Sequence, residues 1–455
     1  MKTKILTLIF LLTITIANTQ IQVLDAKNCD ALWVESDHDT DDICISPEDH
    51  QLLKARIDKS VKNMKKAGIL EKYFSAESRM VHPLFDWPMR QADGFNDPGY
   101  YAISNYVDLA PDTSVLDYNG LSQSYNGHKG IDIRTSPYFW KKMNDSHVEA
   151  IAAEDGVIIL KQDGNNDQSC QCSGSGPWNA VFLLHADGSQ SWYGHLKNNR
   201  TTAKDSGDIV NAGEFLGVIG SSGCSTNPHL HFEVYDDASN LVEPFFGPSN
   251  STTVDSWWAN QLPYYDSAIN KIATHSAAPT AAACPAIEVP NEKFIFNQGD
   301  PISFSVAIRH SLTSDLVELE VFEPDGDQST ILDVSWQRGG PPFFLRASLP
   351  IWNRIITPNA EQGKWTYRVT YNSTNYAPQV VESSFWVKED CVANINHNIA
   401  LTQDTYYQAS NTITSSSSIN NSAHIVYDAE NVTTLLPGFI APVGAKLEIK
   451  LAGCN

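Results

Sequence analysis

Short runs in which apolar and polar residues alternate, separated by glycine-rich turns, fill most of this 455-residue chain from about Phe85 onward. Successive side chains of a β-strand point to opposite faces of a sheet, so a period of two predicts strands with one buried face. Residues 157–160, 180–184 and 232–234 are examples of such apolar runs. The patterning therefore predicts an all-β fold class.

One segment near the N-terminus is predicted to be helical instead. Ser46 is a suitable N-cap, Pro47 fits the first turn, and Gly68 ends the helix. Its apolar side chains recur three or four positions apart, at Leu53, Ile57, Val61 and Met64.

Composition divides the chain into six segments. An Ala/Thr/Pro-rich stretch at 273–285 is the clearest linker. The predicted segments are a signal peptide (1–19), an acidic segment with the helix that is a candidate propeptide (20–76), a first β region (77–265), a linker (266–287), a second β region (288–390) and a C-terminal region (391–455).

The N-terminus predicts export. Lys2 and Lys4 precede an apolar run at 5–17 and polar residues at 18–20, the pattern of a secretory signal peptide. The run is shorter than the roughly 20 residues that span a bilayer. Cleavage is expected between Ala17 and Gln20, and no later segment resembles a membrane span. We therefore expect a secreted protein.

Eight cysteines in an exported chain favour disulfides over thiol chemistry. Cys29 with Cys44, and Cys391 with Cys454, are expected pairs because each brackets a compact segment. The spacing does not decide how the other four cysteines pair: Cys170, Cys172, Cys224 and Cys284. The formal net charge of −22, from 31 basic and 53 acidic residues, argues against a nucleic-acid partner. Nothing in the sequence indicates the oligomeric state.

The second β region has the patterning of an immunoglobulin-like β-sandwich. Apolar residues alternate with polar neighbours at Ile302, Phe304, Val306 and Ile308, and again at Tyr367, Val369 and Tyr371. It contains no cluster of candidate catalytic groups, which favours a packing or binding module. Residues 391–455 are rich in Ser, Asn and Thr and are interpreted as a small β module closed by a disulfide.

Several histidines and one aspartate in the first β region are candidates for a metal site. His128, Gly130 and Asp132 would share one face of a strand, and the glycine between them leaves space for a metal to bridge imidazole and carboxylate. His229 and His231 also share a face. A lone His-x-His is more often an accident, but these pieces lie within 104 residues of one another. Two histidines and a carboxylate are a ligand set of catalytic zinc.

His195, after a Trp-Tyr-Gly run, is a further histidine in this region. Together these residues resemble the lysostaphin-type, LytM-like zinc metalloendopeptidases, which include the β-lytic enzymes. The resemblance begins at Gly127, or already at Phe85, and ends at Pro244. Besides the histidines it includes residues 148–150, 156–157, 207–210, 213–214, 217, 220–223 and 228–234.

The resemblance makes residues 77–265 a zinc metallopeptidase domain, a twisted antiparallel sheet with its metal in a groove between loops. It implies Zn²⁺ as cofactor, with His128, Asp132 and His231 as the metal ligands. It also implies His195 and His229 as the catalytic residues, without deciding which is the general base. The sequence departs from the family in an insert at 163–177, whose Cys170 or Cys172 we expect to pair with Cys224.

The family mostly cleaves bacterial cell-wall peptides, so the implied substrate is a peptidoglycan peptide. The acidic surface keeps one alternative open, a general extracellular protein-degrading metallopeptidase. The other alternative is a catalytically silent binding or regulatory module, and the intact set of five residues argues against it. Glu233 is interpreted equally as a support for the ligands or as a surface carboxylate. Residues 437–454 resemble C-terminal β modules of exported proteins from Gram-negative bacteria, which implies display at the cell surface or release from the cell.

Overall fold

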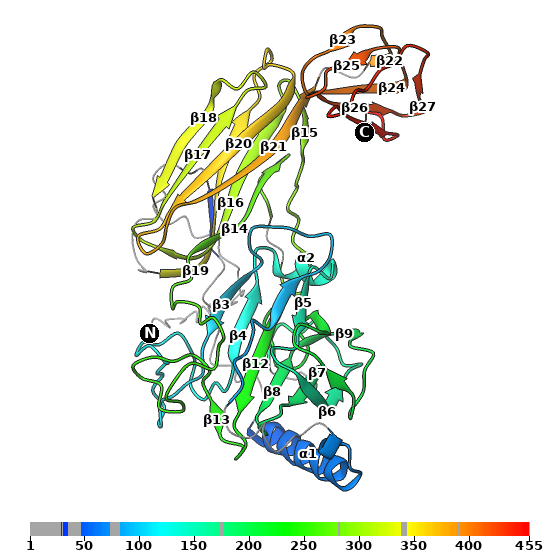
Figure 1. Ribbon diagram of the computed structural model, residues 1–455. Helices are drawn as coiled ribbons and strands as arrows, with labels where there is room; N and C mark the ends of the chain where they lie inside the picture. Colours follow the sequence, from blue (N-terminus) through cyan, green and yellow to red (C-terminus); the bar gives the residue numbers. More distant parts are fainter. Residues whose placement is uncertain are drawn as a thin grey trace, which may run out of the picture.

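The computed structural model describes residues 29, 31–34, 47–72, 82–172, 176–280, 283–337, 344–388 and 392–454. Strands dominate these ranges, which contain two α-helices and one short 3₁₀ helix, Leu70–Lys72. No helix among them is long and apolar enough to cross a membrane. The predicted signal peptide (1–19), Cys44 and Cys391 lie outside the described residues. The all-β fold class is confirmed, and Figure 1 shows three β regions in succession along the molecule.

The first β region is built on one large antiparallel sheet (Figure 1). Its strand order is β10-β6-β7-β8-β12-β4-β3, and β13 also pairs with β12. The strands are β3 (Tyr101–Asn105), β4 (Ile131–Thr135), β6 (Gly156–Gln162), β7 (Ala180–Leu184), β8 (Gln190–Gly194), β10 (Ile209–Val210), β12 (His229–Tyr235) and β13 (Leu241–Val242).

A smaller antiparallel sheet packs beside it, in the order β2-β5-β11-β9. Its strands are β2 (Met89–Gln91), β5 (Val148–Ile151), β11 (Phe215–Ile219) and β9 (Leu196–Thr201), and the short helix α2 (Phe139–Asn144) follows β4. The alternate residues Leu230, Phe232 and Val234 of β12 join the hydrophobic core. The histidines of the same strand therefore face the other way.

Helix α1 (Pro47–Lys66) covers the opposite face of the large sheet, as Figure 1 shows below β6 and β8. Leu53, Ile57 and Met64 pack there in a core cluster with residues such as Phe182 and Trp192. The predicted helix is thus confirmed, including its end near Gly68, which has a φ of 71°.

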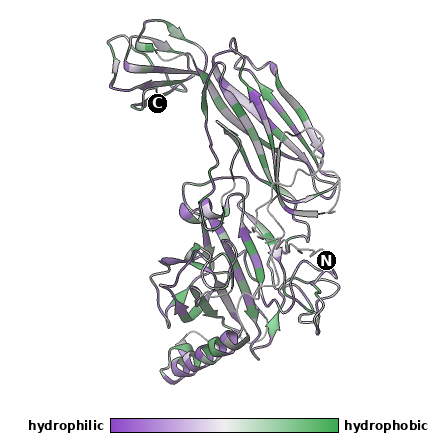
Figure 2. Cartoon of the chain, turned by 180° about the vertical axis from the view of Figure 1, so that it is seen from behind, coloured by the Kyte–Doolittle hydropathy of each residue, from purple (hydrophilic) through white to green (hydrophobic). Residues whose placement is uncertain are grey.

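The second β region is a sandwich of two sheets in the orders β1-β19-β16-β14 and β15-β21-β20-β17-β18. Its strands are β1 (Ala31–Val34), β14 (Ala268–His275), β15 (Ile295–Asn297), β16 (Pro301–Leu312), β17 (Leu316–Phe322), β18 (Gln328–Gln337), β19 (Phe344–Ile355), β20 (Gly363–Asn372) and β21 (Gln379–Lys388). Hydrophobic and hydrophilic residues alternate along these strands (Figure 2), and Trp336, Trp352 and Trp365 are buried between the sheets.

Two segments differ from the expected organisation. Residues 268–275, assigned to the linker 266–287, form β14 and pair with β16 over the whole strand. A bulge between Ile269 and Lys271 interrupts the alternation, so the strand does not show a clean period of two in the sequence. Residues 31–34, assigned to the N-terminal segment, pair with β19 of the sandwich.

The sandwich is joined to the large sheet at its edge strand β3. His310 of β16 donates from Nε2 to the carbonyl oxygen of Ile103 over 2.9 Å. Asn270 of β14 donates to the carbonyl oxygen of Tyr101 over 2.9 Å. An uncovered edge strand presents unpaired backbone groups that invite association with other chains. The sandwich therefore helps to cover β3 at the edge of the large sheet, where Gln123 also donates to the carbonyl oxygen of Ile103.

The C-terminal region is a small solenoid of parallel strands, at the far end of the sandwich in Figure 1. Tyr407 of β24 pairs with Tyr427 of β26, twenty positions later, and Asn411 bonds to both Asn394 and Asn431 in a side-chain ladder. The strands are β22 (Val392–His397), β23 (Ala400–Leu401), β24 (Thr405–Ser415), β25 (Ser418–Ile419), β26 (His424–Ala429), β27 (Val432–Leu435) and β28 (Lys446–Lys450).

A chain that ends at residue 265 should unfold at a lower temperature than the full chain and should associate, because β3 loses the contacts from His310 and Asn270. A chain that ends at residue 390 keeps both contacts and is the control. Calorimetry and light scattering on the two truncated chains would test this. A monodisperse 265-residue chain with the melting temperature of its control would contradict it.

Candidate metal and catalytic site

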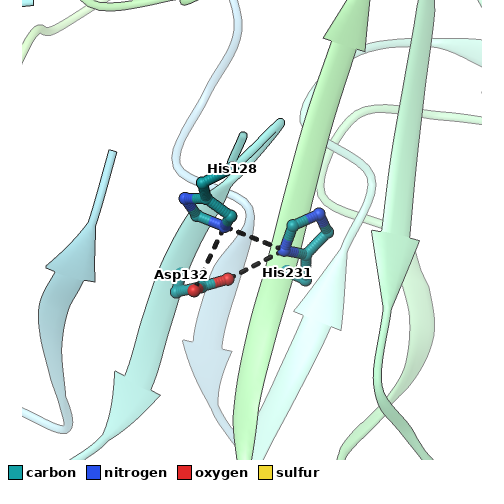
Figure 3. Close-up of side chains that lie close together, drawn as sticks. All are labelled: His128, Asp132 and His231. Carbon is teal, nitrogen blue, oxygen red and sulfur yellow. Dashed lines mark hydrogen bonds and ion pairs between the residues drawn. The ribbon is translucent and has the colours of Figure 1, made fainter. Parts of the chain in front are cut away.

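Asp132 and His231 face each other across two neighbouring strands. β4 and β12 are antiparallel, and their register places Asp132 directly opposite His231. His128 lies in the loop before β4, three residues ahead of the strand, and not on the strand that the sequence pattern predicted. The three side chains converge in Figure 3, and one donor atom of each lies within 4.8 Å of the others.

The inner atoms of this cluster lie at short distances. His231 Nδ1 is 2.8 Å from Asp132 Oδ1 and 3.3 Å from His128 Nε2. His128 Nε2 is 3.2 Å from Asp132 Oδ2. All three residues are at most 3% exposed.

The outer ring nitrogens of both histidines are held by acceptors. His128 Nδ1 donates to the carbonyl oxygen of Tyr106 over 2.7 Å, and His231 Nε2 donates to Glu233 Oε1 over 2.9 Å. A neutral imidazole that donates from one nitrogen has a lone pair on the other. The lone pairs of His128 Nε2 and His231 Nδ1 are thus directed into the cluster, the arrangement that orients metal-binding histidines in proteins.

The carboxylate of Asp132 completes this arrangement. Asn105 donates to its Oδ2 over 3.0 Å. Burial by itself raises the pKa of Asp132, but the neighbouring His128 and His229 outweigh burial and hold that pKa well below its usual range. A buried carboxylate that stays ionised needs compensating positive charge, which a cation held between the three side chains would supply. The donor set therefore fits a divalent cation.

His195 and His229 lie beside the three inner side chains. His229 Nδ1 donates to the carbonyl oxygen of Asn227 over 2.8 Å, and its Nε2 is 3.4 Å from Asp132 Oδ1. His195 Nδ1 donates to the carbonyl oxygen of Ser222 over 2.6 Å. The centres of the two imidazole rings are 4.4 Å apart. The structure thus brings all five predicted side chains into one cluster.

The backbone at His195 is in the left-handed region, with a φ of 60°. A residue other than glycine adopts this conformation at a cost, and such residues concentrate at functional sites. His195 follows Gly194, the last residue of β8, which is paired with His231 of β12. The turn in the chain at this point places the His195 ring 5.7 Å from that of His231.

Gly130 is needed because the His231 ring lies against it. A Cβ atom at this position would lie 2.7 Å from Cε1 and Nε2 of His231. The sequence pattern predicted that the space beside Gly130 would hold a metal. In the structure the imidazole of His231 fills this space. Gly194 is equally restricted, since a Cβ there would lie 2.2 Å from Cζ3 of Trp178.

Two disulfides fix the insert at 163–177. Cys172 is bonded to Cys224, which confirms the expected pairing of Cys224 with a cysteine of the insert. Cys170 is bonded to Cys284, in the segment between β14 and β15. Cys454 is also disulfide-bonded; its expected pairing with Cys391, and that of Cys29 with Cys44, stay predictions.

Several residues that support the site were not identified from the sequence. Asn105 and the carbonyl of Tyr106 come from β3 and the residue after it, and the Trp178 ring lies 5.3 Å from the His195 ring. None of these has a recognisable local motif. Glu233, for which two interpretations were open, is 1% exposed and bonded to His231, so it supports a candidate ligand and is not a surface carboxylate.

The Gly130→Ala variant should bind a divalent cation at least tenfold more weakly, because the new methyl group displaces the His231 ring. Isothermal titration with Zn²⁺ would measure this. Gly176→Ala is the control, since a Cβ there meets no atom within 4 Å and Gly176, like Gly130, does not have a positive φ. Equal affinities of Gly130→Ala and the unchanged protein would contradict this view of the site.

The Cys172→Ser/Cys224→Ser double variant should lose protection of the backbone amides at 220–228, the segment that precedes His229, because the loop is then no longer tied to the insert. Hydrogen exchange measured by mass spectrometry would test this. The C-terminal strand β26 is the internal reference, and unchanged exchange at 220–228 would contradict the expectation.

Comparisons with known proteins agree on this region. Residues 126–244 match the family described as Peptidase family M23. The chain is 39% identical over 82 residues to the DD-carboxypeptidase/endopeptidase Mpg of Neisseria meningitidis, covering 18% of this chain and 16% of that protein. It is 39% identical over 84 residues to lysostaphin of Staphylococcus simulans, covering 18% of this chain and 15% of that protein.

The match thus spans less than a fifth of the length of these curated relatives. The solved catalytic domain of lysostaphin from Staphylococcus simulans aligns at 23% identity over 31% of this chain and 85% of that chain, with a TM-score of 0.20. The family match covers every residue of the histidine and aspartate cluster. The chain therefore contains a Peptidase family M23 domain at residues 126–244, as the resemblance to lysostaphin-type enzymes predicted.

Proposed function

We propose that this protein is a secreted zinc metalloendopeptidase that hydrolyses peptide bonds in the peptides of bacterial peptidoglycan. Zn²⁺ would be held by His128, Asp132 and His231. The observation that carries the proposal is the orientation of the two imidazoles, whose lone pairs converge with a buried carboxylate because their outer N–H groups are bonded elsewhere.

Zinc fits this donor set better than calcium or magnesium. Both of those ions prefer oxygen ligands, whereas the cluster offers two imidazole nitrogens and one carboxylate. Catalytic zinc sites commonly have three protein ligands and a position open to water or substrate. When bound, zinc supplies Lewis acidity that polarises a scissile carbonyl and lowers the pKa of water to about 7.

His195 and His229 are the proposed catalytic residues. Each donates from Nδ1 to a backbone carbonyl oxygen, so Nε2 is the ring nitrogen that would accept or donate a proton in the reaction. The chain contains no His-Glu-x-x-His sequence, whose glutamate serves as the base in other zinc peptidases. One of the two imidazoles would accept the proton of the attacking water, and the other would stabilise the oxyanion or protonate the leaving amine.

The substrate class is supported by relatives in the same family. One is named a DD-carboxypeptidase/endopeptidase, and another, from Staphylococcus capitis, is named a glycyl-glycine endopeptidase and is 42% identical over 59 residues. The net charge of −22 favours a second candidate, a peptidase acting on extracellular proteins, because an acidic surface is repelled by an anionic wall. The two disulfides of the insert support an oxidising location outside the cytoplasm.

The first experiment tests the substrate class and the metal requirement separately. The purified protein is incubated with peptidoglycan and with a general protein substrate, with and without a chelator, and the released amino termini are sequenced. We expect cleavage of the wall peptides, its loss with the chelator and its return with added Zn²⁺. Cleavage of the protein substrate alone would favour the second candidate, and activity that resists the chelator would contradict a zinc enzyme.

The second experiment separates the ligands from the catalytic residues. His128→Ala should lose both zinc and activity, whereas His195→Ala should keep its zinc and lose activity by a factor of about 10² to 10⁴, the usual contribution of a general acid or base. Metal analysis and turnover rates would measure the two effects. His424→Ala, in the C-terminal solenoid, is the control. An active His195→Ala variant would contradict the proposed role.

A further inference from the structure

Helix α1 reaches the candidate metal site through a chain of hydrogen bonds. Glu233 accepts from His231 at one oxygen, Oε1, and from the hydroxyl group of Tyr235 at the other, Oε2, over 2.5 Å. His50 of α1 has its Nε2 2.8 Å from the Tyr235 oxygen and 3.3 Å from Glu233 Oε2. The contacts thus run from His50 to Tyr235, then to Glu233, and from there to His231.

The groups of this chain are almost completely inaccessible to water. Glu233 is 1%, Tyr235 2% and His50 6% exposed. A buried carboxylate must be compensated by donors from the protein, since water does not reach it. Both oxygens of Glu233 are bonded in this way, so its plane is fixed from two sides. Only the donors on the Oε2 side connect Glu233 to α1.

We propose that His50 is a positioning residue of the metal centre, which acts through Tyr235 and Glu233 to hold the ring of His231 in its metal-binding orientation. This inference rests on the proposed function. It also makes α1 part of the working enzyme, in contrast to the sequence-based interpretation of residues 20–76 as a candidate propeptide.

The orientation of His231 depends on Glu233 because an imidazole can rotate about its bond to Cβ. Glu233 Oε1 holds Nε2 on the outer side, which keeps Nδ1 directed at Asp132 and His128. If Oε2 loses its donors, the Glu233 carboxylate can rotate, and the His231 ring bonded to Oε1 can rotate with it. Substitution of a residue that supports a metal ligand in this way typically lowers metal affinity by about 10- to 100-fold.

The docking of α1 does not depend on this polar contact. Leu53, Ile57 and Met64 bury the apolar face of the helix against the sheet. Lys54 adds a hydrogen bond to the carbonyl oxygen of Ser239 over 3.0 Å. A substitution at His50 can therefore remove the contact with Tyr235 while the helix stays in place, which allows the two roles of α1 to be separated by experiment.

The test compares four variants of the full chain: His50→Leu, His50→Gln, Tyr235→Phe and Leu53→Ala. Zinc affinity is measured by competition with a chelator, ligand geometry by the visible spectrum of the cobalt-substituted protein, and stability by thermal unfolding. His50→Leu and Tyr235→Phe should weaken zinc binding by about tenfold, the lower end of the usual range, and should change the cobalt spectrum.

The other two variants are matched controls. His50→Gln keeps an N–H donor near the position of Nε2 and should restore the affinity and spectrum of the unchanged protein. Leu53→Ala, on the same turns of α1, should lower the melting temperature and leave both metal readouts unchanged. Tyr235→Phe tests the same chain of contacts from the sheet, so the inference is tested even if His50→Leu does not fold.

Two results would overturn the inference. One is a His50→Leu or Tyr235→Phe variant with the zinc affinity and cobalt spectrum of the unchanged protein. The other is a Leu53→Ala variant that reproduces their loss, which would reduce His50 to a packing residue. An unchanged protein that binds no zinc would instead overturn the proposed function, and the inference with it, so the two failures are distinguishable.

Discussion

The pairing of β4 with β12 is the constraint on which the site depends. Residues directly opposite in an antiparallel pair have Cβ atoms about 4.5–5.5 Å apart, so the register itself holds Asp132 and His231 within reach of one cation. A slip of either strand by one residue would turn its own side chain, Asp132 or His231, into the core. Ile131, Ile133, Leu230 and Phe232, buried on the other face, oppose such a slip. The hydrophobic core thus fixes the geometry of polar groups that it does not touch.

The sequence allowed the site to be predicted better than its surroundings. The alternation of side chains on a strand is local, so it placed His229 and His231 on one face without any structure. The hydrogen bonds that orient the rings are not local: Glu233 reaches His50 across 183 positions. No spacing rule reports such contacts. His128 was placed on a strand in error, because its alternation with Asp132 continues into a loop.

The dependence on contacts between distant residues also explains why parts of the accessory regions were not predicted. The alternation at β14 is broken by a bulge, and β1 is too short to stand out before pairing with β19. The solenoid did leave a signal, because Tyr-x-Ala-x-Asn occurs at 407–411 and again at 427–431, and a search for internal repeats would have found it. Once folded, α1 and the sandwich are joined to the M23 sheet, one at a face and the other at an edge. They stabilise it from two sides.

The parallel stacking of the C-terminal strands has a consequence for how such chains change over evolution. Each coil of a solenoid contacts only its neighbours. Gain or loss of one repeat unit, the twenty positions that separate Tyr407 from Tyr427, would lengthen or shorten the stack by one strand spacing, about 4.8 Å, without disturbing the M23 domain. The distance between the sandwich and the last strand of the stack would change with the number of units.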